Sequence, residues 1–160
     1  MKGIGCSEGY GVGQVLIVKE QDLTFTPKLD CDPQVELDRF QGAVGIFCDK
    51  TQSSAKQISK SAGSKEAEII LSHIMIIKDP YLTGEIQKCI SLGQCAESAL
   101  SFACDKVAAA FSSSEDELTR QRAADVVDVK NTMLSILLNR QYTDLSHLTE
   151  NTVLVAHNLT

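Results

Sequence analysis

Apolar side chains between residues 32 and 62 recur every three or four positions, which is the period of an amphipathic α-helix. Asp32 is a good N-cap, Pro33 suits the first helical position, and Gly63 suits the stop. At about 1.5 Å per residue this helix would be about 45 Å long, so we expect it to act as a long arm. Its seam is apolar in the first half and thinner later, and consists of Leu37, Phe40, Val44, Phe47, Thr51, Ser54 and Ile58.

Four more segments have helical patterns, and two of them have recognisable starts. Asp79 followed by Pro80 repeats the cap-plus-proline signal, and Ser114 followed by Glu117 is a capping box. The predicted segments are 64–77, 79–93, 95–111 and 114 to about 139. Together with the first segment they form a subdomain that we expect to have four helices, with 79–93 as a short segment between them.

The segment 64–77 is apolar on more than one side. A helix of this kind is either deeply buried or carries a docking surface. One face holds Ile70, Ile74 and Ile77, while Ile69, Met75 and Ile76 lie outside it.

Both ends of the chain contain continuous apolar runs that predict β-strands. The first run covers residues 15–18, and residues 152–159 are typical of a strand buried on both faces. Because each strand needs partners, we expect the two to share one sheet, with the helices inserted between them. The second run ends one residue before Thr160 without further strands to cover it, so we expect a piece of a protein, cut inside a domain.

The expected fold is therefore mainly α, with a four-helix subdomain inserted between strands of an incomplete α/β domain. We assign residues 1–30 to the first strand region, 31–141 to the helical domain and 142–160 to the returning strand.

Five glycines between Gly3 and Gly13 precede the first strand. A Walker loop ends in Gly-Lys-Ser/Thr, and a dinucleotide-binding loop follows a strand and opens a helix. Neither arrangement is present, so both phosphate-binding interpretations fail. The glycines suggest backbone turns or close approach to another segment.

Charge and composition narrow the function further. A net charge of -6 and a pI near 5.0 argue against nucleic-acid binding, which favours a basic stripe. No signal peptide and no run of about 20 apolar residues is found, so we expect a cytoplasmic protein without membrane insertion. The six cysteines form no C-x-x-C pair and the three histidines are not at ligand spacing, which favours buried thiols over a metal site.

Four blocks of residues occur in an order that resembles a known family. They are Gly3-Ile4 with Ser7, Gly9 and Gly13; His73-Ile74-Met75 before Asp79-Pro80; Arg122-Ala123-Ala124-Asp125-Val126 with Asp128; and Val153-Leu154-Val155-Ala156 with Leu159-Thr160. Over essentially all of its length the chain resembles the N-terminal region of enzyme I of the bacterial phosphotransferase system, or a close enzyme I paralogue. This enzyme is the phosphoenolpyruvate-protein phosphotransferase.

The resemblance implies a function in sugar uptake. In this family, phosphoenolpyruvate phosphorylates a histidine of an α/β domain, and the phosphoryl group passes to the carrier HPr, which docks on an inserted helical domain. The phosphorylated histidine lies in a Thr-Ser-His or similar motif, downstream of the segment matching Leu159-Thr160, and no such motif occurs here. The barrel that binds phosphoenolpyruvate and magnesium is also missing. We therefore expect this chain alone to be inactive and to hold no cofactor.

The same resemblance implies which residues face HPr. Exposed Met and Ile side chains would form an adaptable apolar patch, and acidic side chains could meet a basic carrier. Since family enzymes dimerise through the barrel, this chain is expected to be a monomer. The residues carried over are His73, Met75, Ile76, Asp79, Leu82, Phe111, Leu118 and Arg122.

Without the resemblance, simpler interpretations of these residues stay open. His73 would be a half-buried histidine between helices, and Met75 and Ile76 would be ordinary core. Arg122 and Asp125, three positions apart, would form a local ion pair or a brace between helices. A stand-alone, non-catalytic helical interaction module is the alternative function.

Overall fold

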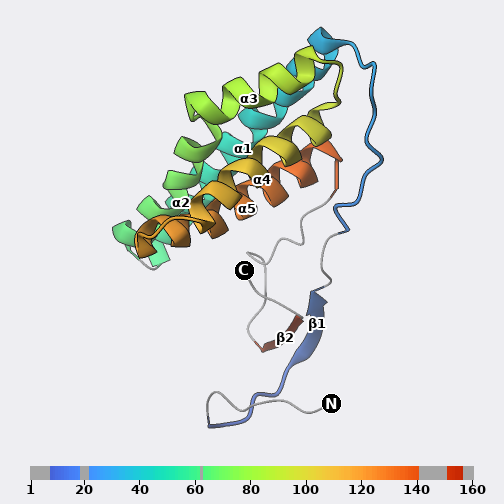
Figure 1. Cartoon of the computed structure of the whole chain (residues 1–160). Helices are drawn as coiled ribbons and strands as arrows, with labels where there is room; N and C mark the ends of the chain where they lie inside the picture. The colour runs from blue at the N-terminus through green and yellow to red at the C-terminus, as the bar shows by residue number, and fades with distance from the viewer. Residues whose placement is uncertain (1–7, 19–21, 62, 141–150, 157–160) are drawn as a thin grey trace. The chain divides into compact units, whose positions relative to one another are not determined.

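A computed structural model describes residues 8–18, 22–61, 63–140 and 151–156 (Figure 1). The chain divides into two compact units. One consists of Leu23–Gln141, and the second consists of Met1–Asp22 together with Tyr142–Thr160. The elements are β1 (Gln14–Val18), α1 (Pro33–Ser61), α2 (Ser64–Ile77), α3 (Pro80–Ser91), α4 (Ala96–Ser112), α5 (Glu117–Leu137) and β2 (Thr152–Ala156).

The mainly helical fold with a small sheet confirms the predicted fold class. The described residues contain five helices, however, rather than the expected four. Each of the five helical patterns in the sequence forms a helix of its own, because Gly63, Asp79 and Gly93 interrupt the backbone between the first four. Gly63 and Gly93 have φ angles of 124° and 87°, in a region that residues with a side chain rarely adopt.

Local capping explains where two of the helices begin. The carboxylate of Asp32 accepts hydrogen bonds from the backbone N–H groups of Gln34 at 2.9 Å and Val35 at 3.3 Å. Asp79 accepts in the same way from Tyr81 at 2.9 Å and Leu82 at 3.0 Å. These bonds satisfy amide groups that have no partner within the first helical turn. The two predicted N-caps are confirmed.

The capping box predicted at Ser114 is wrong. Asp116 is the N-cap of α5, and its carboxylate accepts from the backbone N–H of Thr119 at 2.8 Å. The hydroxyl of Ser114 accepts instead from the backbone N–H of Asp116 at 3.2 Å, so it forms part of the turn before the helix.

The helical unit has one continuous core to which all five helices contribute. Burial of one large apolar side chain contributes about 1.5 to 3 kcal/mol to the free energy of folding, so the side chains of this core supply much of the stability. Two residues before α1, Leu23 and Phe25, also pack against the core and belong with the helical unit. The largest fully buried side chains are Phe47, Ile77, Leu82, Ile86, Ile90, Leu100, Val126, Val129 and Met133.

The long helix α1 is not a projecting arm. It has 29 residues and packs against α2, α3, α4 and α5. Its buried positions include Phe40, Phe47 and Ala55, which are spread along most of its length. The helix is therefore the common support of the bundle.

Four of the cysteines are buried in the helical unit, as expected for thiols used as small apolar side chains. These are Cys48, Cys89, Cys95 and Cys104. Burial raises the pKa of the Cys104 thiol to about 12, so it stays protonated at neutral pH.

The two strands pair in parallel, with Gln14 opposite Thr152 and Val18 opposite Ala156. Gly13 lies directly against the other segment, because a Cβ at this position would be 1.9 Å from the carbonyl oxygen of Asn151. The close approach predicted for the glycine-rich entry is thus found at Gly13.

The second strand is not buried on both faces. Its side chains are half-buried or exposed, and no described side chain of β1 is buried. The physical reason is that the described sheet has two strands and none of their side chains belongs to the helical core. Residues 157–159 of the predicted strand lie outside the described residues.

Candidate functional site

Two packed helices, α2 and α5, carry most of the exposed side chains of the predicted docking set. Met75 on α2 is 75% exposed and Leu118 on α5 is 71% exposed. Arg122 is also exposed, and His73 is half-buried. We call this surface, defined by His73, Met75, Leu118 and Arg122, the α2–α5 face.

The α2–α5 face combines apolar and charged groups. His73 lies close enough to Asp128 on α5 to influence its carboxyl electrostatically. Burial is the main cause that raises the pKa of Asp128, the negative charge of Asp125 adds to it, and His73 acts in the opposite direction. A charge on α2 therefore acts on a carboxyl group of α5 at this face.

Arg122 is free to meet a partner. No ion pair joins it to Asp125 in the described part of the chain, so the local ion pair considered from the sequence is not formed. Arg120, two residues earlier, pairs with Glu117 instead. The guanidinium of Arg122 thus stays in solvent on the exposed side of α5.

Three further residues of the predicted set have structural roles. Asp79 is exposed but caps α3, so its carboxylate is already engaged by backbone N–H groups. Ile76 and Phe111 are half-buried and pack against the core. Only part of each of these two side chains could contact a partner.

Leu82 was a wrong choice for a surface contact. Its side chain is 1% exposed and belongs to the core. The helical period of α3 places it on the same side as Ile86 and Ile90, which face α1 and α4. A partner could not reach it without opening the bundle.

The prediction that α2 has a second apolar side is confirmed, and it adds surface residues to those carried over. Ile77 is fully buried, whereas Ile69 and Met75 are exposed, and Leu71 is 39% exposed. In the sequence, the apolar residues that lie outside the buried face of α2 indicated this second side. The sequence did not reveal how far the exposed side extends.

A polar cluster at the other end of the bundle was not predicted. The guanidinium of Arg39 donates to Glu36 at 2.6 Å and to Glu97 at 2.5 Å, and a weaker hydrogen bond reaches the carbonyl of Leu137 at 3.5 Å. Glu36 also accepts from the backbone N–H of Ala96 at 2.8 Å. The cluster links α1 to the start of α4 and the end of α5.

The two carboxylates of this cluster are nearly buried. Burial is the largest influence on Glu36 and acts to raise its pKa, but the hydrogen bonds from Ala96 and Arg39 outweigh it and hold the pKa below 4.5. Hydrogen bonds to Glu97 and Glu36 raise the pKa of Arg39. Glu36 and Arg39 are therefore charged and paired near neutral pH.

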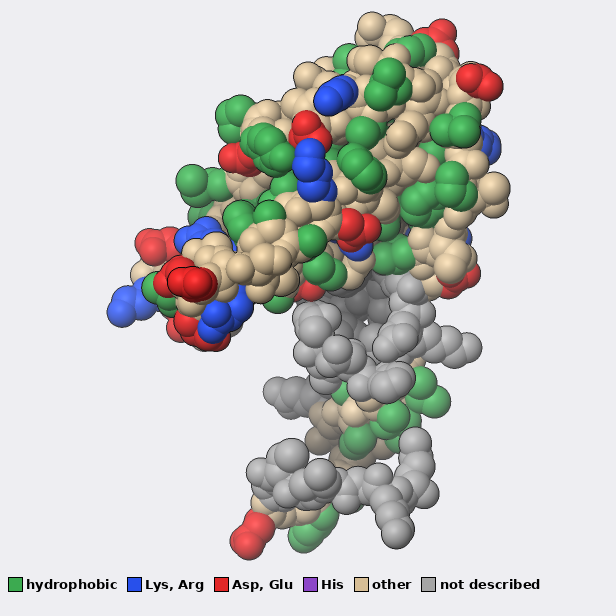
Figure 2. Space-filling view, in the orientation of Figure 1, with side chains coloured by type: hydrophobic (Ala, Val, Ile, Leu, Met, Phe, Trp, Pro, Cys, Tyr) green, Lys and Arg blue, Asp and Glu red, His purple; other side chains and the backbone are tan. Residues whose placement is uncertain are grey.

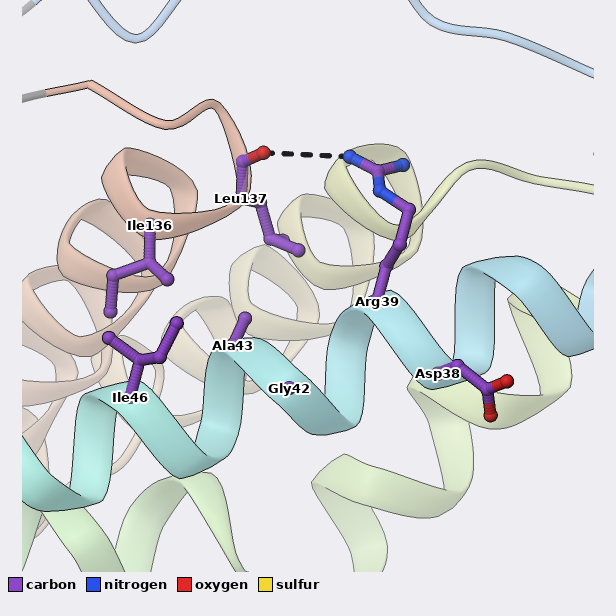
Figure 3. A pocket seen from close by; sticks show the side chains of 7 residues that line it. All are labelled: Asp38, Arg39, Gly42, Ala43, Ile46, Ile136 and Leu137. Atoms are coloured by element: carbon purple, nitrogen blue, oxygen red, sulfur yellow. Dashed lines mark hydrogen bonds between the residues drawn. The ribbon is translucent and has the colours of Figure 1, made fainter.

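A shallow groove lies beside this cluster, between α1 and the end of α5 (Figure 3). Its volume is about 220 Å³. Ile46 and Ile136 point toward each other across it, and Gly42 adds no side chain to the lining (Figure 3). The lining contains one carboxylate and one guanidinium and has no nucleophile or histidine to carry chemistry. The residues are Asp38, Arg39, Gly42, Ala43, Ile46, Ile136 and Leu137.

The described residues include no group of three or more His, Cys, Asp or Glu side chains placed to hold a metal ion. Among these same residues, no helix has the length and apolar character needed to cross a membrane. The candidate sites described above are surfaces of the helical unit.

Solved structures first define the fold, which is that of the N-terminal region of enzyme I. A structure described as "Enzyme I (nEIt)" matches with a TM-score of 0.83 and 24% identity, over 94% of this chain and 62% of that chain. A structure described as "N-terminal domain of Enzyme 1 - Nitrogen" matches with a TM-score of 0.74 and 21% identity over the same shares. At these identities the likeness shows the fold alone.

Sequence comparison then identifies the family. Residues 2–122 match the family model described as "PEP-utilising enzyme, N-terminal", and the chain belongs to this family. It is 31% identical to the phosphoenolpyruvate-protein phosphotransferase of Listeria innocua and 29% identical to that of Bacillus subtilis, over its whole length. The chain spans 28% of the length of each of these relatives. The resemblance stated from four blocks of residues is confirmed.

Proposed function

We propose that this chain is the phosphocarrier-docking region of a phosphoenolpyruvate-protein phosphotransferase acting in sugar uptake. It binds HPr, or an HPr-like domain, on the α2–α5 face. The observation that carries the proposal is the pair of packed helices that hold Met75 and Leu118 more than two-thirds exposed in a member of this family. Exposed, adaptable apolar side chains beside a free guanidinium are typical of a protein interface.

The chain contributes docking and no phosphoryl chemistry of its own. Its one described histidine, His73, is half-buried beside Asp128. We propose that the phosphorylated histidine, the phosphoenolpyruvate site and the magnesium ion belong to the rest of the enzyme. We also propose that the chain by itself is a monomer.

Binding of HPr to the ¹⁵N-labelled chain tests the docking proposal. We expect amide signals of Met75 and Leu118 to shift on addition of HPr from the same organism, while those of Val15 and Val153 stay in place. Replacing either side chain, as in Met75→Asp or Leu118→Asp, should weaken binding by about tenfold or more, since both lie exposed on the proposed interface.

Leu92→Asp is the matched control, because Leu92, the C-cap of α3, is 73% exposed and lies outside the α2–α5 face. It should leave the affinity for HPr unchanged. Shifts confined to other helices, or equal losses in Leu92→Asp and Met75→Asp, would contradict the proposed face.

Incubation with phosphoenolpyruvate and magnesium tests the second part. We expect no phosphohistidine on the isolated chain by mass spectrometry under conditions that keep the acid-labile bond. In the gene, a Gly-Gly-x-Thr/Ser-Ser-His motif is expected soon after codon 160. Finding no such motif would favour the stand-alone interaction module instead.

A further inference from the structure

A second exposed apolar surface lies between α3 and α4. It forms a groove of about 280 Å³. Leu92 is 73% exposed and Phe102 is 56% exposed. None of the residues predicted to meet HPr lines it. The lining consists of Glu85, Lys88, Cys89, Leu92, Gln94, Phe102 and Lys106, which we call the α3–α4 groove.

The rim of the α3–α4 groove is basic, although the whole chain has a net charge of -6. Its charged residues are two lysines and one glutamate. Lys106 pairs with Glu85 at 2.5 Å and lies 5.7 Å from the centre of the Tyr81 ring. Lys88 forms no ion pair among the described residues. In Figure 2, hydrophobic and basic side chains lie side by side on the face made by α3 and α4.

The groove is held by well-packed backbone, so its shape exists before anything binds. Its floor residue Cys89 is 6% exposed, and the neighbouring Ile90 belongs to the core. Leu92 is the C-cap of α3, where its N–H donates to the carbonyls of Lys88 and Cys89. A site that is already ordered loses little conformational entropy on binding, and this favours affinity for a short segment.

We propose that the α3–α4 groove docks an acidic segment of a partner protein. One apolar side chain of the segment inserts between Leu92 and Phe102, and its carboxylates lie against Lys88 and Lys106. The unpaired ammonium of Lys88 sets the preferred charge of the partner, and the exposed aromatic and leucine side chains supply the anchor site.

A second copy of this chain fits the groove less well. In a symmetric dimer the same patch meets itself, so Lys88 and Lys106 of one copy would face the lysines of the other. Like charges brought together at an interface oppose association. An acidic segment instead carries the charge that is complementary to these lysines.

Selection from a library of short random peptides displayed on phage tests the proposal. The full chain is the bait, and the doubly substituted chain Leu92→Asp/Phe102→Asp is used to remove peptides that bind elsewhere. We expect the remaining peptides to be enriched in Asp and Glu around one large apolar residue.

A synthetic copy of the most enriched peptide then gives the affinities. We expect Lys88→Glu to weaken its binding by about tenfold, while Met75→Asp, at a residue equally exposed on the α2–α5 face, leaves it unchanged. Since Lys88, Leu92 and Phe102 are exposed, these variants should keep the wild-type thermal unfolding curve.

Three results would overturn the proposal. One is a selected set without excess acidic residues, and another is equal binding to wild type and to Lys88→Glu. The third is a concentration-dependent dimer in sedimentation that Leu92→Asp abolishes, which would assign the groove to a second copy. None of these results bears on HPr binding, which is tested with Met75→Asp and Leu118→Asp.

Discussion

The helical unit and the strand pair are both rich in apolar residues, yet only the helical unit buries them. Five helices enclose one core in which Ile86 and Leu100 are fully buried. In the strand pair, Val15 and Ile17 are each 63% exposed. The difference shows that apolar content alone does not make a core, because burial needs elements on several sides.

A unit with its own core can fold alone. We therefore expect residues 23–141 to be stable as an isolated fragment, whereas two paired strands without a buried face are only marginally stable in water. Four predictions test this comparison.

The largest expected effect comes from a matched pair of isoleucines. Ile86→Ala, at a fully buried position, should lower the free energy of unfolding by about 2 to 5 kcal/mol because it leaves a cavity. Ile17→Ala, at an exposed position in β1, should change it by less than about 0.5 kcal/mol. Urea unfolding followed by circular dichroism measures both. Similar losses in the two variants would refute the comparison.

A smaller effect is expected at the polar cluster. Arg39→Met removes the partner of two nearly buried carboxylates, and the half-exposed position of Arg39 allows water to reduce the loss. We expect a loss of about 1 to 3 kcal/mol. Arg122→Met, at an exposed arginine without an ion pair, is the control and should be close to neutral. An unchanged midpoint for Arg39→Met would mean that the cluster contributes nothing measurable.

The same cluster predicts the acid sensitivity of the helical unit. Because the pKa of Glu36 is lower in the folded state than its ordinary 4.5, its contribution is present above that pH and is lost as the pH falls through the folded value. Glu36→Gln should therefore be less stable than wild type near neutral pH and should lose less stability on acidification. Thermal unfolding between about pH 6 and pH 3 measures both slopes. Parallel slopes would rule out Glu36 as a source of acid sensitivity.

The smallest effect on the helical unit should come from Gly13→Ala, although it acts strongly on the strands. Its Cβ would be 1.9 Å from the carbonyl oxygen of Asn151, so β1 and β2 cannot keep their register. We expect faster hydrogen exchange at Leu16 and Leu154 and a helical unfolding midpoint that stays the same. Gly11→Ala, with no atom within 4 Å of the added group, is the control. Loss of helical stability would show that the units depend on each other.

Local signals in the sequence were reliable where one side chain decides the outcome. Asp32 and Asp79 each cap a helix, and the proline that follows each of them marks the first helical position. At α5, Ser114 and Asp116 are two good caps only two residues apart, and the sequence pattern chose the wrong one. Competition between neighbouring residues is settled by backbone geometry, which the pattern does not contain.

The surface was harder to predict than the helices. Helical period placed Leu82 on a face but could not say that α1 and α4 cover this face. The polar cluster was missed because Arg39 and Glu97 lie 58 positions apart in the chain. Helical period already placed Met75 outside the buried face of α2, whereas the exposed Leu118 came from the family resemblance alone.

One hydrogen bond gives the helical unit a further property. Arg140, just after α5, donates to the carbonyl of Thr24 at 2.9 Å, so the chain enters and leaves this unit at nearly the same place (Figure 1). A unit with adjoining ends can be exchanged as a cassette with little disturbance to the host. Under the proposed docking function, grafting the helical cassette of one relative between the strands of another would transfer the choice of carrier protein.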